Sequence, residues 1–216
     1  MQKRFTPEEQ AAQLRKPHGE DARVIAEYMA AQNVKLYGEI LKSLNVESGQ
    51  HILEVGCGEA LLAGDIVGRA ADVFYTGIDY SPEMIAMAKW RWTNIHAITL
   101  LQGEIANMPF SDSSFDVVFG INVVYFWDEP RIELEEIKRV MKSGGQLLLG
   151  YRPKEKMKQI PFTARQFNLY DPPELVAILE EAGFEREESF LFDEEPRLIS
   201  GEWKPMQGCV SAFKKA

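Results

Sequence analysis

The chain has 216 residues and a formal net charge of −9, with 45% hydrophobic and 26% charged residues. These values are ordinary for a globular protein, so they exclude a wholly disordered chain, and the length fits one α/β domain. The acidic balance argues against nucleic acid or an anionic membrane surface as the main partner.

Helices and strands are expected to alternate along the chain. Apolar residues recur at helical spacing over 21–44, and the apolar run 51–55 before Gly-Cys-Gly predicts a buried strand. Ser81 followed by Pro82 marks the start of a later helix. The further elements are expected to be helices at 59–68, 82–92, 130–141 and 171–183, and strands at 73–78, 97–102, 115–121, 146–151, 184–192 and 206–214.

This order predicts how the strands pair. Strands that alternate with short helices form right-handed βαβ units and a mostly parallel sheet. The last two strands have no helix between them, so we expect them to be antiparallel. Ligands of such sheets bind at the carboxyl ends of the strands, near the point where the strand order reverses.

Two glycines lie where the first predicted strand meets the next helix. Gly56 and Gly58 allow a sharp turn and let a ligand approach the backbone without meeting a Cβ atom. The following strand ends at Asp79, 21 residues after Gly58, a spacing that suits a carboxylate accepting hydrogen bonds from ribose hydroxyls. A tight turn alone would explain the glycines, but together with this acid they predict a nucleoside cofactor.

The residues beside the turn discriminate between two cofactor classes. A dinucleotide dehydrogenase favours a small residue at position 61 for close helix packing, whereas this chain has Leu61. A carboxylate at Glu54 would lie poorly beside a pyrophosphate and fits a ligand with an ammonium group and no phosphate, such as S-adenosylmethionine. An NAD-dependent oxidoreductase is therefore the less favoured alternative.

With these motifs the sequence resembles the class I S-adenosylmethionine-dependent methyltransferases, particularly the small-molecule, type 11-like group. The resemblance is strongest over 50–150 and implies a Rossmann-like, doubly wound fold, with a mostly parallel seven-stranded sheet, an antiparallel C-terminal strand and helices on both faces. The family often has a third glycine where Ala60 stands, and Asp-Ala where Glu104-Ile105 stands. The motifs that carry it are HILEVGCGEA, YTGIDYSPEMIAMAK, LLQGEIANMPFSDSSFDVVFG and LEEIKRVMKSGGQLLLG.

The resemblance implies roles for residues around the methionine part of the cofactor. Glu54 would reach its amino group, directly or through water. Gly56, Cys57 and Gly58 would pass under its methionine and ribose parts, and Tyr37 of the long N-terminal helix would touch it.

The same resemblance assigns residues to the other end of the cofactor. Asp79 would hold the ribose hydroxyls, with Tyr80 packed against the adenine. Glu104 and Ile105 would flank the adenine, and Asn122 would lie near the sulfonium. For Tyr80 and Ile105, plain packing is the alternative interpretation.

We expect one methyltransferase domain over 1–216, with four segments. Residues 1–48 would form a helical cap over the site, 49–151 the cofactor-binding core, 152–170 a candidate lid, and 171–216 a C-terminal helix and strand pair. The 152–170 insert holds five basic residues against one acid, and 171–200 holds ten acids against two bases. Solvated surface explains both blocks; contact with an anionic substrate is the alternative for the basic one.

The catalytic groups are less well defined by the sequence. Methyl transfer from a sulfonium is an in-line displacement, so the protein mainly aligns the reacting atoms and excludes water. A general base helps only some acceptors. His18 and Tyr125 are the candidates, although an exposed loop position would explain His18 and a core position Tyr125.

The two cysteines, Cys57 and Cys209, lie far apart and at no metal-ligand spacing, so we expect a reducing compartment, no disulfide and no metal. No secretory signal or membrane-spanning run is recognisable, which predicts a cytoplasmic protein. We therefore expect a monomeric or homodimeric methyltransferase that uses S-adenosylmethionine on a small-molecule acceptor, without nucleic acid or membrane. A non-catalytic S-adenosylmethionine-binding regulatory protein is the alternative.

Overall fold

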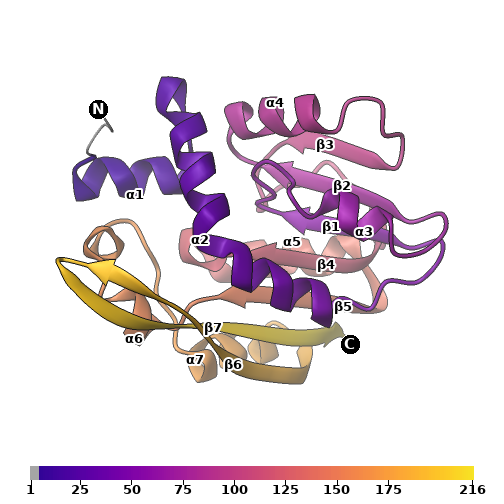
Figure 1. Ribbon diagram of the computed structural model, residues 1–216. Helices are drawn as coiled ribbons and strands as arrows, with labels where there is room; N and C mark the ends of the chain where they lie inside the picture. The colour runs from indigo at the N-terminus through magenta and orange to yellow at the C-terminus, as the bar shows by residue number, and fades with distance from the viewer. Residues whose placement is uncertain (1–4) are drawn as a thin grey trace.

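The strands of the computed structural model, which describes residues 5–216, form one seven-stranded sheet in the order β3-β2-β1-β4-β5-β7-β6 (Figure 1). β1 to β5 are parallel, and β7 is antiparallel to both β5 and β6. The strand order reverses between β1 and β4. The strands are β1 (His51–Val55), β2 (Phe74–Asp79), β3 (Ile98–Gln102), β4 (Phe115–Ile121), β5 (Met141–Tyr151), β6 (Phe184–Ile199) and β7 (Glu202–Lys215).

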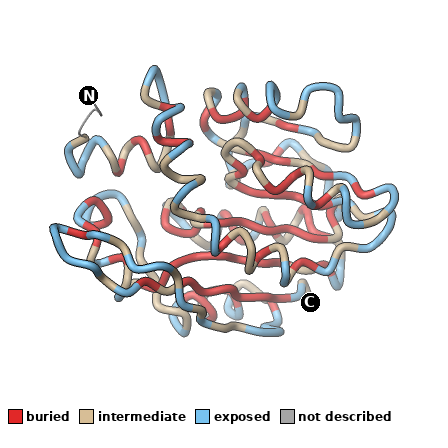
Figure 2. The backbone as a smooth tube through the Cα atoms, in the orientation of Figure 1, coloured by how far each residue is buried: buried red, intermediate tan, exposed pale blue. Residues whose placement is uncertain are grey.

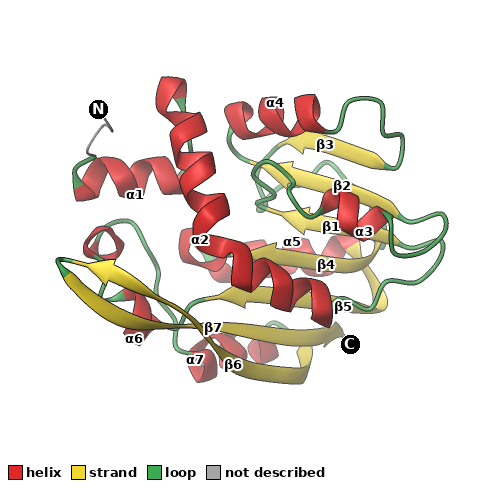
Figure 3. Ribbon diagram, viewed as in Figure 1, coloured by secondary structure: helices red, strands yellow, loops and turns green. Residues whose placement is uncertain are grey.

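Helices cover both faces of this sheet, which confirms the predicted doubly wound architecture (Figure 3). Leu53 and Val118 face a core completed by α5 and α7, whereas Ile52 and Val117 face the core beneath α2, α3 and α4. Successive strand residues therefore alternate between two apolar cores. The helices are α1 (Pro7–Arg15), α2 (Ala22–Ser43), α3 (Ala63–Val67), α4 (Pro82–Arg91), α5 (Pro130–Val140), α6 (Lys154–Met157) and α7 (Pro172–Glu181).

Polar caps begin the helices where the sequence indicated. Ser81 accepts a hydrogen bond from the backbone N–H of Met84 at 3.2 Å, directly before α4. Asp171 and Glu174 form a capping box at the start of α7. The same device at Thr6 and Glu9 starts α1, a helix that the element prediction omitted although its T-x-x-E pattern stands in the sequence.

The structure corrects two predicted elements. The helix expected over 59–68 is reduced to α3, because Gly58 and Ala60 have φ angles of 53° and 52° and the chain cannot turn helically there. The two final strands were expected to be separated by a long loop. They instead form one continuous hairpin, closed by Ser200 and Gly201, which both have positive φ.

The hairpin of β6 and β7 extends beyond the other strands of the sheet. Its outer half projects past the other strands toward α1 and α6 (Figure 1) and is largely exposed or half-buried, whereas the central strands are buried (Figure 2). This extension brings residues near 194–199 to the carboxyl-end side of the parallel strands. Short 3₁₀ helices at Gly19–Asp21, Val124–Phe126 and Pro161–Ala164 complete the same end of the molecule.

Candidate functional site

A cavity of about 500 Å³ lies at the carboxyl ends of the parallel strands, where the strand order reverses. The loops after β1 to β5 form its floor, and α2 and the segment before it form much of the opposite wall. This is the place where doubly wound sheets bind ligands. All ten residues expected to contact a cofactor line it: Tyr37, Glu54, Gly56, Cys57, Gly58, Asp79, Tyr80, Glu104, Ile105 and Asn122.

The glycine turn is held against β2. The backbone N–H groups of Gly56 and Cys57 both donate to the carbonyl of Ile78, at 2.8 and 3.1 Å. A Cβ at Gly56 would lie 2.4 Å from a methyl of Val123, so this glycine is required by packing. A Cβ at Gly58 would meet no atom within 4 Å, because this residue faces open space. Gly58 therefore leaves room for a ligand.

Asp79 connects the turn to the end of β2. One carboxylate oxygen accepts from the Gly58 N–H and the other from the Ser81 N–H, each at 2.8 Å. Burial raises the pKa of Asp79, and these two donors oppose the rise. A carboxylate has about four lone-pair sites, so acceptor capacity remains for ligand hydroxyls.

Tyr80 and Glu54 lie on either side of Asp79 in different surroundings. The exposed ring of Tyr80 carries the Lys16 ammonium 3.7 Å from its centroid, a cation–π contact with the N-terminal segment. Glu54 is buried and accepts a hydrogen bond from the Tyr75 hydroxyl. Burial raises the pKa of Glu54 to about 8, and the nearby charge of Asp79 adds to the rise. A ligand ammonium beside Glu54 would reverse this penalty.

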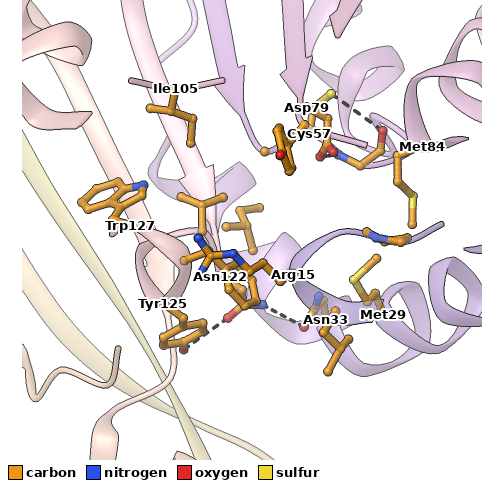
Figure 4. Close-up of a pocket in the computed structure, with 18 of the residues that line it drawn as sticks. Arg15, Met29, Asn33, Cys57, Asp79, Met84, Ile105, Asn122, Tyr125 and Trp127 are labelled. Atoms are coloured by element: carbon orange, nitrogen blue, oxygen red, sulfur yellow. Dashed lines mark hydrogen bonds between the residues drawn. The ribbon is translucent and has the colours of Figure 1, made fainter. Parts of the chain in front are cut away.

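A polar network forms the far side of the cavity. Asn122 donates to the Asn33 side chain at 3.1 Å, and dashed lines in Figure 4 link Asn122 to Asn33 and to Tyr125. The Tyr125 hydroxyl accepts from the Arg152 N–H at 2.5 Å and donates to the Arg152 carbonyl at 3.0 Å. Burial raises the pKa of Tyr125 well above its usual value. The Tyr125 hydroxyl therefore holds the backbone after β5, and its role as a base stays a prediction.

The second candidate base is not at the cavity. His18 is exposed and does not line it. Its Nδ1 lies 2.9 Å from the Lys16 carbonyl, and the buried side chain of Gln13 bonds both the backbone N–H and the carbonyl of His18. These contacts fix the segment with His18 outside the cavity lining, and its role as a base stays a prediction.

The N-terminal segment closes over the cavity. Arg15 forms an ion pair with Asp128 from the loop before α5, and both residues line the cavity. Ser81 donates its hydroxyl hydrogen to the Pro17 carbonyl at 2.5 Å. Residues 14–17 thus connect α1 to both sides of the site. In Figure 4, Arg15 lies between Asn122 and the sulfur-bearing side chain of Met29.

Sequence reasoning missed the charged side of the cavity. Arg152 belongs to the block of bases and Glu194 to the block of acids, and both were expected to be solvated surface. They are instead buried and paired, with Arg152 Nε 2.5 Å from one oxygen of Glu194. Arg197, which belongs to none of the sequence motifs, also lines the cavity. The complementary charges of the two blocks were the available signal.

Aromatic side chains form another wall. Phe126 and Phe167 meet edge to face with centroids 4.9 Å apart, and Phe167 also contacts Phe162 and Tyr125 at 5.8 Å. Phe162 and Phe167 come from the 152–170 insert, which therefore contributes an apolar surface to the cavity. Trp127 and Ile105 also line the cavity (Figure 4).

None of the helices within residues 5–216 has the length and apolar character that a membrane span requires. The same residues also contain no cluster of three or more His, Cys, Asp or Glu side chains that could hold a metal ion.

Comparisons with known proteins match this geometry. A family model for a methyltransferase domain matches residues 53–149. The Bacillus subtilis protein described as uncharacterized methyltransferase YdaC is 31% identical over 163 residues, which are 75% of this chain and 87% of that protein. Demethylmenaquinone methyltransferase of Staphylococcus saprophyticus is 34% identical over 115 residues, and the match covers 50% of this chain and 47% of that protein. The match thus spans about half the length of that relative.

Among solved structures, a similar one comes from the complex between the Haloferax volcanii Trm112 methyltransferase activator and a methyltransferase. The TM-score is 0.77 over 88% of this chain and 92% of that chain, at 19% identity. This likeness concerns the fold.

Proposed function

The chain belongs to the class I S-adenosylmethionine-dependent methyltransferases, and from that premise we propose that it methylates a small-molecule acceptor. One observation carries the proposal: the cavity is roofed by residues 14–17 through the contacts of Arg15 and Pro17. Such a roof narrows the access to the cavity, which favours a small acceptor over a polymer strand. The name of the demethylmenaquinone relatives, which match over about half their length, agrees with this class of acceptor.

The residues of the cavity fit S-adenosylmethionine. Gly58 faces open space, Asp79 keeps free lone pairs, and the carboxyl of Glu54 suits an ammonium group. We assign Gly58 and the glycine turn to the methionine and ribose, Asp79 to the ribose hydroxyls, and Glu54 to the amino group. The cofactor supplies an electrophilic methyl group on a sulfonium centre.

The remaining assignments follow the shape of the cavity. Tyr80, Glu104 and Ile105 would hold the adenine beyond β2 and β3. Asn122, fixed by its hydrogen bond to Asn33, would lie beside the sulfonium together with Tyr37. The work of the protein in this scheme is alignment and exclusion of water, for which the roof over the cavity is suited.

The cofactor part of the proposal is tested by calorimetric titration with S-adenosylmethionine and S-adenosylhomocysteine. Asp79→Ala should weaken binding at least tenfold, because a hydrogen bond to a charged group contributes about 1.5–3 kcal/mol. Asp65→Ala, at an exposed site on α3, is the matched control and should bind as the wild type does. Absence of binding at millimolar ligand to folded protein would contradict the assignment.

The acceptor part needs a separate measurement. Protein is incubated with methyl-tritiated S-adenosylmethionine and a cell extract divided into metabolite, protein and nucleic-acid fractions. We expect label in the metabolite fraction only. Label confined to a macromolecular fraction would overturn the small-molecule acceptor, and binding without label in any fraction would favour the non-catalytic alternative.

A further inference from the structure

Arg197 lines the cavity from the side of β6 and has no carboxylate within ion-pair distance among residues 5–216. Within the same residues, its hydrogen bond goes from Nη2 to the carbonyl of Gln32, at 2.9 Å. A guanidinium has five N–H donors, so most of its donor capacity is left for another group. Arg197 is half-buried, so its positive charge costs free energy unless an anion lies beside it.

The neighbouring charges do not neutralise Arg197. Arg152 occupies both oxygens of Glu194, with contacts at 2.5 and 2.8 Å. The cluster therefore holds two guanidinium groups and one carboxylate. Burial lowers the pKa of Arg197, and the charge of Arg152 lowers it further. A second anion at this place would stabilise the cluster.

A β-bulge explains how both side chains reach the same place. Residues three apart on a regular strand point to opposite faces of the sheet. The pairing of β6 with β7 shifts between Glu194 and Arg197, so Glu194 reaches Arg152 while Arg197 reaches Gln32 of α2, which Arg152 also contacts. Pro196 is tolerated within the bulge because β6 is an edge strand. Bulges commonly redirect side chains beside functional sites.

A hydroxyl and an apolar wall lie next to this cation. Tyr28 lines the cavity one helical turn before Gln32, and its hydroxyl has no hydrogen-bond partner among the described residues. The Gln32 carbonyl accepts from both Arg152 and Arg197, and Gln32 lies four residues after Tyr28 on the same face of α2. The charges of both arginines oppose the rise that burial causes in the pKa of Tyr28. Met29 and Phe126 line the same cavity. A cationic fork, a free hydroxyl and apolar surface therefore adjoin one another.

We propose that this part of the cavity is the acceptor subsite, and that the acceptor is a carboxylic acid with an apolar body, held through its carboxylate by Arg197 and Tyr28. The inference rests on the proposed function, since it names the class of its acceptor. The planar guanidinium fork matches a carboxylate in two parallel hydrogen bonds, and the tyrosine hydroxyl adds a third donor. The aromatic wall covers the apolar body.

The test compares probes that differ only in the end group. Benzoate, 3-phenylpropionate and octanoate are titrated against the protein with S-adenosylhomocysteine present, each beside its primary amide and its amine. We expect at least one acid to bind tenfold or more tightly than its amide and its amine. Equal binding of acid and amide, preference for the amine, or no binding of any acid at about 10 mM, about tenfold above the upper end of typical KM values, would overturn the proposal.

Variants assign the preference to the named side chains. Arg197→Gln should abolish the preference for acids, and Tyr28→Phe should reduce it severalfold. Arg186→Gln, at an exposed arginine of the same strand, should retain it. A preference for acids that survives in Arg197→Gln would overturn the role of Arg197. If that variant does not fold, Arg197→Lys keeps the charge but loses the fork, and acid affinity equal to the wild type would then contradict the proposal.

Failure of this inference is distinguishable from failure of the proposed function. Titration of S-adenosylhomocysteine alone reports the cofactor site, and the acid titrations are repeated without it. Loss of cofactor binding contradicts the proposed function, whereas intact cofactor binding without acid preference contradicts only the acceptor class.

Discussion

Arg152 and Glu194 form a buried two-pronged ion pair that joins the end of β5 to the bulge of β6. The Nε and Nη2 atoms of Arg152 contact the two carboxylate oxygens at 2.5 and 2.8 Å, and both side chains are only 4% exposed. Arg152 also donates to the Gln32 carbonyl at 2.7 Å and to Asn33 at 2.9 Å. One guanidinium therefore ties the core sheet, the C-terminal hairpin and α2 together around the cavity.

Glu194→Gln is expected to destabilise the protein by about 3–5 kcal/mol, because it leaves the buried Arg152 without an opposite charge. Urea denaturation measures this loss. Glu187→Gln on the same strand is the matched control, since Glu187 pairs with Lys214 at the surface and should cost less than about 1 kcal/mol. Equal losses in the two variants would show that the buried pair has no special role.

Glu54→Gln is expected to stabilise the ligand-free protein at high pH. The pKa of Glu54 is raised to about 8 by burial, so between its ordinary value and pH 8 the folded state holds a proton that the unfolded chain has released. The contribution of Glu54 to the free energy of unfolding of the wild type therefore falls as pH rises through that range. Relative to the wild type, the free energy of unfolding of Glu54→Gln should be higher by up to about 5 kcal/mol above pH 8 and should differ little near pH 4.

Urea denaturation at pH 5, 7 and 9 follows this difference. Glu47→Gln, at an exposed site, is the matched control and should change the free energy of unfolding by no more than about 0.5 kcal/mol. The same Glu54→Gln protein should bind S-adenosylhomocysteine more weakly than the wild type, because an uncharged amide cannot form an ion pair with the ammonium group. A stability difference that is constant with pH would refute the buried, proton-holding carboxyl.

The glycine turn gives a matched pair of alanine variants. Gly56→Ala places a methyl 2.4 Å from Val123 at a φ of 67°, so strain and overpacking together should cost about 2–4 kcal/mol. Gly58→Ala has the same kind of φ but meets no atom, and should cost about 1 kcal/mol. Ala60 shows that this turn accepts an alanine at positive φ.

The loss of cofactor affinity should follow the opposite order, with the larger effect in Gly58→Ala. The methyl of Gly58→Ala projects into the open space assigned to the cofactor, so the affinity for S-adenosylhomocysteine should fall more than tenfold in calorimetry. If Gly58→Ala binds like the wild type, the cofactor does not pass over this residue.

Tyr125→Phe is expected to lower stability by about 1–3 kcal/mol, because it leaves the buried N–H and carbonyl of Arg152 without partners. Cofactor affinity should stay within about twofold of the wild type, since the two shorter hydrogen bonds of the hydroxyl go to the backbone after β5 and its contact with Asn122 is the longest of the three. Denaturation and calorimetry measure the two effects. Unchanged stability combined with lost methyl transfer would instead make Tyr125 a catalytic residue.

Local patterns in the sequence determined the half of the cavity that we assign to the cofactor. The β1 strand, the glycine turn and the Ser81 cap are set by neighbouring residues, and parallel strands necessarily bring their carboxyl ends to one edge. Glu54, Gly58 and Asp79 therefore met at the cavity as expected. The motif residues needed no long-range information, because each lies at the end of its own strand.

Only the tertiary structure decided the other half. Arg152 and Glu194 are 42 residues apart, and their pairing depends on a bulge in an edge strand and on a hairpin that continues past its expected end. The same hairpin brings Arg197 to Gln32, 165 residues away. Charge composition showed a basic block and an acidic block, but the register that buries one member of each follows from strand pairing, which sequence periodicity does not encode.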